Sequence, residues 1–190
     1  MSKRFVSTYL RDDFDIDNVD GYDYQIDEIA HHLSMLCRFN GALSSYYSVA
    51  EHSIHVATLL PPELKMAGLL HDAAEAYIGD IVSPIKDRIC LKDVKNTINI
   101  ADLEDKILRA IFKKLSVKWP GKRDAKLISR ADAAMCQYEW DNDVGSLAPW
   151  ISDRDRDVNR MVLKDFGGLH KYNNVDAEDQ YLLAYELFAC

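Results

Sequence analysis

Apolar residues recur at helical spacing through the first half of the chain. Residues three and four apart lie on one face of a helix, so this spacing predicts amphipathic helices. Two such stretches cover residues 26–37 and 49–60, and a third begins at Pro62 and reaches about residue 77. The turn-forming pairs Asn40-Gly41 and Pro61-Pro62 separate the three stretches, because glycine and proline interrupt helices.

The same spacing returns in the second half, after a loop that Gly79 and Pro84 predict. It indicates three further helices, at residues 96–115, 124–140 and 178–188. Residues 146–174 carry no pattern that favours one element over another. We therefore expect an all-α fold of about five to seven helices.

The first 24 residues differ from the rest of the chain. They are acidic and rich in Asp, Asn and Gly, with a weak apolar alternation that favours at most a short hairpin. A chain of 190 residues is long enough for one well-packed domain. We expect an N-terminal arm at residues 1–24 that packs on a single domain at residues 25–190.

Composition narrows the class of protein. Apolar residues make up 48% of the chain and charged residues 28%, which excludes disordered and collagen-like chains. With 23 basic and 31 acidic residues, the formal net charge is -8. A surface of that sign repels phosphate polymers and anionic bilayers. We expect neither a nucleic-acid polymer nor a membrane as partner, and an anionic small molecule would need a local group of cations.

The four cysteines, Cys37, Cys90, Cys136 and Cys190, form no CxxC pair. A chain of this size does not need disulfides for stability, so we expect reduced, mostly buried thiols. No stretch approaches the roughly 20 apolar residues of a membrane span. The first residues also lack the apolar stretch of a signal peptide. These features predict a cytoplasmic protein.

Three segments place metal-binding side chains inside apolar helical patterns: Glu51-His52 with His55, His71-Asp72 with Glu75, and Arg130-Ala131-Asp132. Burial of an imidazole or a carboxylate is costly unless the group is paired or binds a metal. One shared divalent metal ion would explain all three segments. Taken alone, His52 has a simpler interpretation as a hydrogen-bonded core histidine, and Asp132 as a carboxylate on a helix face.

The spacing within the second segment favours a common site. If the segment is helical, His71 and Asp72 lie about 100° apart around the axis and both can approach one ion. Glu75 lies one turn further on the face of His71, close enough to steer a water molecule or to hold a second ion. Asp80 follows Gly79 at the exit of the helix. The alternatives are a solvated Glu75 and an Asp80 that only caps a turn.

The motifs AEHSIHVA, GLLHDAAEAYIGDIVSPIK and SRADAA follow one another in this order, and CRFNG precedes them. This series resembles the HD-domain phosphohydrolase superfamily, in particular the bacterial 5′-deoxynucleotidase branch and the related phage deoxynucleoside triphosphate hydrolases. The likeness extends over roughly residues 26–86, with a further match at residues 129–132. It rests on HDxxExxxxGD followed by Pro84 and Lys86 rather than on the HD dipeptide alone. The resemblance implies that residues 25–190 form an HD-domain helical bundle.

The resemblance also implies the metal and catalytic groups. The metal ligands would be His52, His71, Asp72 and Asp132. Such a mixed imidazole and carboxylate set suits Mn, Co, Fe, Mg or Zn. Glu75 and Asp80 would be catalytic, with Glu75 acting on the attacking water or the leaving group and Asp80 near the sugar.

Substrate contacts are implied at three positions. Arg38 would grip the phosphate, and Lys86 would line the same pocket, although surface cations are the commoner fate of such residues. Phe39 stands where the branch has a tryptophan that packs against the sugar, so sugar selectivity does not carry over. His55 matches no ligand position. Of the tyrosines and Trp140, most belong in the core or at its rim, and one could stack on a base.

The resemblance implies a metal-dependent phosphohydrolase that releases phosphate from deoxynucleoside 5′-monophosphates. One alternative is a dATPase-like dNTP triphosphohydrolase, which releases triphosphate. Another, from a different class, is a catalytically silent module that binds a nucleotide. Hydrolysis of a signalling nucleotide is disfavoured because the HD-GYP motif is absent. Enzymes of this branch are commonly dimers or larger, so a homo-oligomer is expected.

Overall fold

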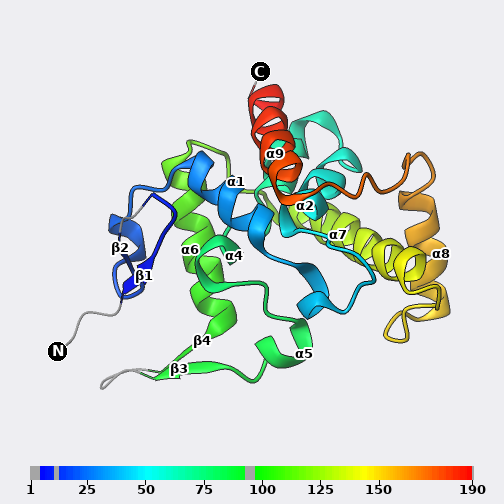
Figure 1. Cartoon of the computed structure of the whole chain (residues 1–190), viewed down its shortest axis with the longest axis horizontal. Helices are drawn as coiled ribbons and strands as arrows, with labels where there is room; N and C mark the ends of the chain where they lie inside the picture. Colours follow the sequence, from blue (N-terminus) through cyan, green and yellow to red (C-terminus); the bar gives the residue numbers. More distant parts are fainter. Residues whose placement is uncertain (1–4, 11–12, 93–96, 190) are drawn as a thin grey trace.

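The computed structural model describes residues 5–10, 13–92 and 97–189, and this part of the chain is mostly helical (Figure 1). The helices are α1 (Ile26–Met35), α2 (Val49–Thr58), α3 (Lys65–Leu69), α4 (Glu75–Ile78), α5 (Ser83–Lys86), α6 (Ile100–Lys114), α7 (Lys122–Asp143), α8 (Asp153–Val162) and α9 (Asn174–Phe188). The antiparallel pairs β1 (Phe5–Ser7) with β2 (Asp13–Asp15) and β3 (Cys90–Lys92) with β4 (Thr97–Asn99) are the strands, and η1 (Val19–Gly21), η2 (Arg38–Gly41) and η3 (Pro62–Leu64) are 3-10 turns. The predicted class is confirmed as a mainly helical fold.

Polar caps set where several helices begin. The side chain of Ser48 accepts a hydrogen bond from the Glu51 N–H at the start of α2, and Asn99 caps α6 in the same way. A cap of this kind satisfies an amide that the first turn leaves without a partner. The Asn99 cap moves the start of α6 to Ile100, later than predicted, because residues 97–99 pair with β3.

The predicted helix over residues 62–77 is wrong in its middle part. The α3 helix ends at Leu69, the backbone then turns, and α4 begins at Glu75. A helix would pair the Gly68 carbonyl with the N–H four residues later. Instead, that carbonyl accepts from the backbone N–H of His71, three residues later, at 3.4 Å, and from His71 Nδ1 at 2.8 Å. His71 and Asp72 therefore lie on a turn rather than on a helix.

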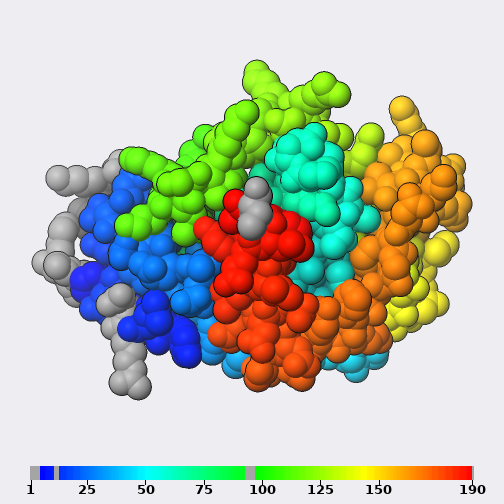
Figure 2. All heavy atoms as spheres, turned by 90° about the horizontal axis from the view of Figure 1, so that it is seen from above, coloured from blue at the N-terminus to red at the C-terminus, as the bar shows by residue number. Residues whose placement is uncertain are grey.

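The C-terminal helix closes the core. It packs against α1, α2 and α3, and Figure 2 shows it in red between the blue N-terminal part and the blue-green α3 region. Its Tyr181 is fully buried and donates to the carbonyl of Leu69 at 2.9 Å.

A Cβ on Gly68 would collide with the Leu60 side chain and lie 3.3 Å from the Cα of Ala57. Glycine thus lets α3 approach α2 closely.

The N-terminal segment is a part of the core rather than only an arm on its surface. The expected short hairpin is present as β1 and β2, paired from Phe5 with Asp15 to Ser7 with Asp13. Phe14, Val19 and Tyr24 are buried in the main hydrophobic cluster. Residues 1–4 and 11–12 lie outside the described part.

Three features have no counterpart in the sequence prediction. The short α5 helix lies in the predicted loop after Gly79, the α8 helix lies within residues 146–174, and the β3–β4 hairpin extends away from the bundle in Figure 1. Among the residues described, no helix has the length and apolarity needed to cross a bilayer.

Cys37, Cys90 and Cys136 are free thiols. The prediction of mostly buried thiols is wrong in that Cys90 is exposed and the other two are only half-buried; Cys190 lies outside the described residues.

Candidate metal centre and cavity

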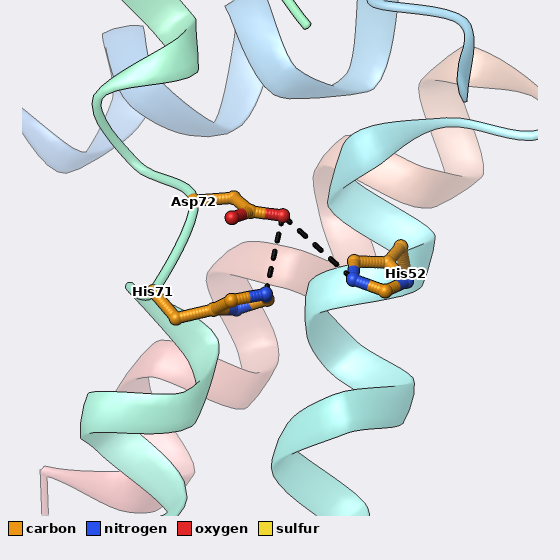
Figure 3. Close-up of side chains that lie close together, drawn as sticks. All are labelled: His52, His71 and Asp72. Carbon is orange, nitrogen blue, oxygen red and sulfur yellow. Dashed lines mark ion pairs between the residues drawn. The ribbon is translucent and has the colours of Figure 1, made fainter. Parts of the chain in front are cut away.

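Two histidines and two carboxylates from three segments meet at one point. His52 lies on α2, His71 and Asp72 on the turn after α3, and Asp132 on α7. Asp72 Oδ2 lies 3.1 Å from His71 Nε2 and 3.7 Å from His52 Nε2, between the two rings (Figure 3). Asp132 Oδ1 lies 3.2 Å from His52 Nε2 and 4.0 Å from His71 Nε2. The fold thus brings together all four residues that the resemblance implied as ligands.

Hydrogen bonds on the far side of each ring fix its orientation. His52 Nδ1 donates to Glu139 Oε1 at 2.6 Å, and His71 Nδ1 donates to the Gly68 carbonyl. Within the described residues, both Nε2 atoms are buried without a hydrogen-bond partner. One ligand atom each from His52, His71 and Asp72 lies within 4.8 Å of the others, so the three can hold a metal ion. Two imidazole nitrogens beside carboxylate oxygens form a donor set that suits a divalent metal.

The charges of the cluster demand a cation. Burial and the nearby Arg38 disfavour a proton on His52, but Glu139 and Asp132 outweigh them and raise the pKa of His52 to about 9. Burial also disfavours a charged Asp72, but the histidines and Arg38 outweigh it and hold the pKa of that carboxyl well below its usual range. In the protein alone, a protonated His52 offsets part of the charge of the carboxylates. A metal ion supplies the same positive charge.

Glu139 is a buried group that the sequence analysis missed. It is fully buried on α7, where its Oε1 also accepts from the Tyr47 hydroxyl at 2.8 Å and its Oε2 lies 3.3 Å from Arg38 Nε. Burial opposes its charge, yet His52 and Arg38 lower its pKa to about 2. Glu139 follows Asp132 by seven residues, two helical turns on the same face. That spacing was the available signal.

Arg38 is a buried cation, with 8% of its surface exposed, so the interpretation as a surface charge is wrong. Its Nη1 lies 3.7 Å from Asp72 Oδ2. The next two residues, Phe39 and Asn40, have φ angles of 55° and 52°, a left-handed conformation that is uncommon for bulky side chains. This turn places Arg38 and Phe39 beside the cluster rather than at the end of the first helix.

A cavity of about 710 Å³ opens beside the cluster. Asp72 and Asp132 line it, whereas His52 and His71 do not. The remaining residues that the sequence analysis singled out as catalytic or substrate-binding also line it: Arg38, Phe39, Glu75, Asp80 and Lys86. The cavity is thus bordered by both the candidate metal cluster and two cations.

Glu75 and Lys86 contact each other in this cavity. Glu75 is 4% exposed, so it is not a solvated helix residue. Burial, followed by Asp72 and Asp80, raises its pKa well above the usual range. Lys86 Nζ lies 3.6 Å from Glu75 Oε1 and 2.8 Å from Glu104 Oε2. Glu104, which the sequence analysis did not identify, holds the lysine in place.

Asp80 also lines the cavity. Burial raises its pKa, although Arg38 opposes the shift. The residue follows Gly79, whose φ of 81° ends α4 and turns the chain into the cavity wall. A left-handed φ of this kind favours glycine. The fold therefore gives Asp80 a position beside the cluster.

Glu51 and His55 do not join the cluster, so a shared metal would account for His52 alone among the three polar residues of the first segment. The Glu51 carboxylate accepts hydrogen bonds from the backbone N–H groups of Lys171 and Tyr172, at 2.6 and 2.9 Å, and ties that loop to α2. His55 Nδ1 lies 2.9 Å from the Tyr47 hydroxyl. The burial of the Glu51 carboxylate and of His55 Nδ1 therefore has its own hydrogen-bonding explanation.

Two known proteins are similar to part of this chain. No family model matches the chain. It is 43% identical over 82 residues to the uncharacterized protein YfdR of Escherichia coli K12, a match that covers 43% of this chain and 46% of YfdR. It is 40% identical over 76 residues to an uncharacterized protein of Rhodobacter capsulatus, covering 35% of this chain and 39% of that protein. The chain thus spans less than half the length of either relative, and neither name states an activity.

Proposed function

We propose that this protein is an HD-domain metal-dependent phosphohydrolase that acts on deoxynucleoside 5′-phosphates and releases phosphate from the monophosphates. One observation carries the proposal. The cluster of His52, His71, Asp72 and Asp132 borders a cavity of about 710 Å³ that Arg38 and Lys86 also line. A metal-binding set beside two cations is the arrangement that a phosphate ester requires.

The four residues of the cluster would hold the ion. Their nitrogen and oxygen atoms suit Mn, Co, Fe, Mg or Zn. Bound there, a divalent ion would act as a Lewis acid toward a phosphate oxygen and increase the acidity of water. His52 and His71 offer Nε2 because their Nδ1 protons are committed to Glu139 and to the Gly68 carbonyl.

Arg38 would bind the phosphate. Its guanidinium is anchored through Nε, 3.3 Å from Glu139 Oε2, while Nη1 lies beside Asp72 at 3.7 Å. A planar guanidinium offers several N–H donors and can bind two phosphate oxygens at once. The anchor holds Arg38 at the cluster without using all of its donors. An overall negative protein would thus capture an anion at one local cation.

Glu75 would handle the proton that hydrolysis moves. Among the residues described, its buried Oε2 has no hydrogen-bond partner, and burial favours its protonated form. A protonated Glu75 can donate to the 5′ oxygen of the leaving deoxynucleoside. After transfer, the carboxylate is stabilised by Lys86 Nζ, 3.6 Å from its Oε1. Asp80 would face the sugar in the same cavity.

A product analysis tests this function. The purified protein is incubated with each dNMP and each dNTP in the presence of Mg, Mn, Co or Zn, and chromatography separates nucleoside, phosphate and triphosphate. The proposal expects deoxynucleoside and phosphate from the monophosphates with at least one metal. Triphosphate released from a dNTP would indicate the dNTP triphosphohydrolase instead. No product with any pair of substrate and metal would refute hydrolysis and favour a silent binding module.

A further inference from the structure

Part of the cavity lining is aromatic. Trp140 on α7 and Trp150 before α8 both line it, and neither takes part in the phosphate chemistry proposed above. Their ring centroids are 4.9 Å apart, and the two planes are inclined by 71°. We call these two residues the indole pair. A flat ring that stacks on one indole would meet the other at its edge.

A continuous row of side chains joins this pair to the phosphate-binding end. The guanidinium carbon of Arg38 lies 5.2 Å from the centroid of the Phe39 ring. The Phe39 ring in turn lies 5.7 Å from that of Trp140. The row therefore runs from a cation through one aromatic ring to the indole pair. A nucleotide has the same order: phosphate, sugar, base.

Trp140 has a donor that the fold leaves without a partner. Its Nε1 is buried, and no hydrogen-bond acceptor reaches it from any residue that the structure describes. Buried polar groups are nearly always paired, and an indole nitrogen can only donate. Because this nitrogen is closed to solvent, a ligand in the cavity that carries an acceptor reaches it only when neighbouring side chains move aside.

Trp150 offers an open ring on a built loop. The residue is 51% exposed although it lines the cavity. The loop before it is anchored, because the buried Ala148 donates its N–H to Asp141 Oδ1 at 2.6 Å. Arg156 holds the same turn by contacting both Asp141 Oδ2, at 3.1 Å, and the Ala148 carbonyl. An exposed indole on an anchored loop favours stacking with a ligand.

We propose that the indole pair is a nucleobase subsite, in which the base stacks on Trp150 and accepts a hydrogen bond from Trp140 Nε1. This inference rests on the proposed function, since it names the part of the substrate that the phosphate site does not contact. It makes the protein selective for nucleotides over sugar phosphates. Phe39 then lies at the level of the sugar.

Binding without turnover tests the subsite apart from the reaction. Calorimetry in EDTA measures the Kd of 2′-deoxyadenosine 5′-monophosphate and of 2-deoxyribose 5-phosphate, which lacks only the base. The parent protein should bind the nucleotide at least about tenfold more tightly, as one base stacked on an aromatic ring provides. In Trp150→Ala the ratio of the two Kd values should fall to about two or three. Trp140→Phe keeps a ring but loses the N–H, and it should lower the same ratio by about fivefold.

Matched controls separate the subsite from general damage. Leu147→Ala changes an exposed residue of the same loop that does not line the cavity, and Trp119→Phe changes the tryptophan that packs against Phe112. Both should keep the parental ratio. An equal Kd for the two ligands in the parent, loss of affinity for both ligands alike in Trp150→Ala, or no binding of either ligand would overturn the subsite. Selective binding without phosphate release in the product analysis would refute only the proposed hydrolysis.

Discussion

Replacing Glu139 by Gln should weaken metal binding although Glu139 is not itself among the proposed ligands. The carboxylate accepts from His52 Nδ1 at 2.6 Å and from Tyr47 at 2.8 Å through one oxygen, and its other oxygen faces Arg38 Nε at 3.3 Å. Glutamine has one acceptor oxygen and one NH₂ donor. If its oxygen stays with His52, the NH₂ faces the Arg38 donor. If it flips, the NH₂ faces His52 Nδ1.

Either orientation disturbs the centre. The flipped one forces the proton of neutral His52 onto Nε2, the nitrogen that would bind the metal. The other removes the carboxylate charge that lies 3.3 Å from the buried Nε of Arg38, and a buried cation that loses its paired charge is strongly destabilised. Loss of a carboxylate that supports a ligating histidine typically lowers metal affinity by about 10- to 100-fold. We expect a loss of that size for Mn²⁺ in Glu139→Gln, with helical circular dichroism retained.

Calorimetric titration of the metal-free protein with Mn²⁺ measures this effect. Glu51→Gln is the matched control, since Glu51 is equally buried but binds the backbone of Lys171 and Tyr172 instead. It should reduce stability and leave the affinity for Mn²⁺ within about threefold of the parent. Parental affinity in Glu139→Gln, or an equal loss in Glu51→Gln, would refute the role of Glu139 in orienting His52.

Three further outcomes are expected. Glu75→Gln should retain metal and lower kcat by about 10² to 10⁴; loss of metal would instead make Glu75 a ligand, and an unchanged kcat would exclude it from proton transfer. Arg38→Ala should lose about 2 to 4 kcal/mol in kcat/KM with normal metal content, and Arg38→Lys should also be impaired. Arg88→Ala is the control because Arg88 is exposed; equal damage in both alanine variants would contradict a phosphate contact. Burial lowers the pKa of His55 to about 4. The stabilisation from burying the neutral imidazole is therefore complete above about pH 6.5, and about 3 kcal/mol of it is lost as the pH falls toward 4. In denaturant unfolding, the stability of His55→Gln should decline less on the acid side than that of the parent, and an unchanged pH dependence would disprove this.

Much of the helical framework follows from the sequence, because burial of one apolar face imposes a period that the chain displays directly. The α1 and α2 helices and most of α6, α7 and α9 lie where that period predicts them. The α8 helix was missed because it carries few apolar residues; its buried side chains include the polar Arg156 and Asn159. The turn at His71 was missed because it depends on a side chain competing for the Gly68 carbonyl, a contact that no period encodes.

Some residues of the candidate site could be predicted from the sequence, and others could not. The sequence brings His52, His71, Asp72 and Asp132 to attention through charged groups in apolar surroundings and through the resemblance, and the fold brings them within 4.0 Å of a neighbour in the cluster. The sequence gives no such signal for Glu104, whose contact with Lys86 joins α6 to α5. The unpaired Nε1 of Trp140 is equally invisible in sequence, because only packing decides which donors lose their partners.

Titration of activity with metal tests the central claim most directly. The protein is freed of metal with EDTA, Mn²⁺ is added stepwise in the presence of a deoxynucleoside 5′-monophosphate, and released phosphate is measured together with bound metal. The parent should be inactive without metal and gain phosphate release as the ion binds. Asp72→Ala and His71→Ala should bind little metal and lose well over tenfold in rate while keeping their helical circular dichroism. Phosphate release at the full rate in EDTA, or in a variant that binds no metal, would contradict the account.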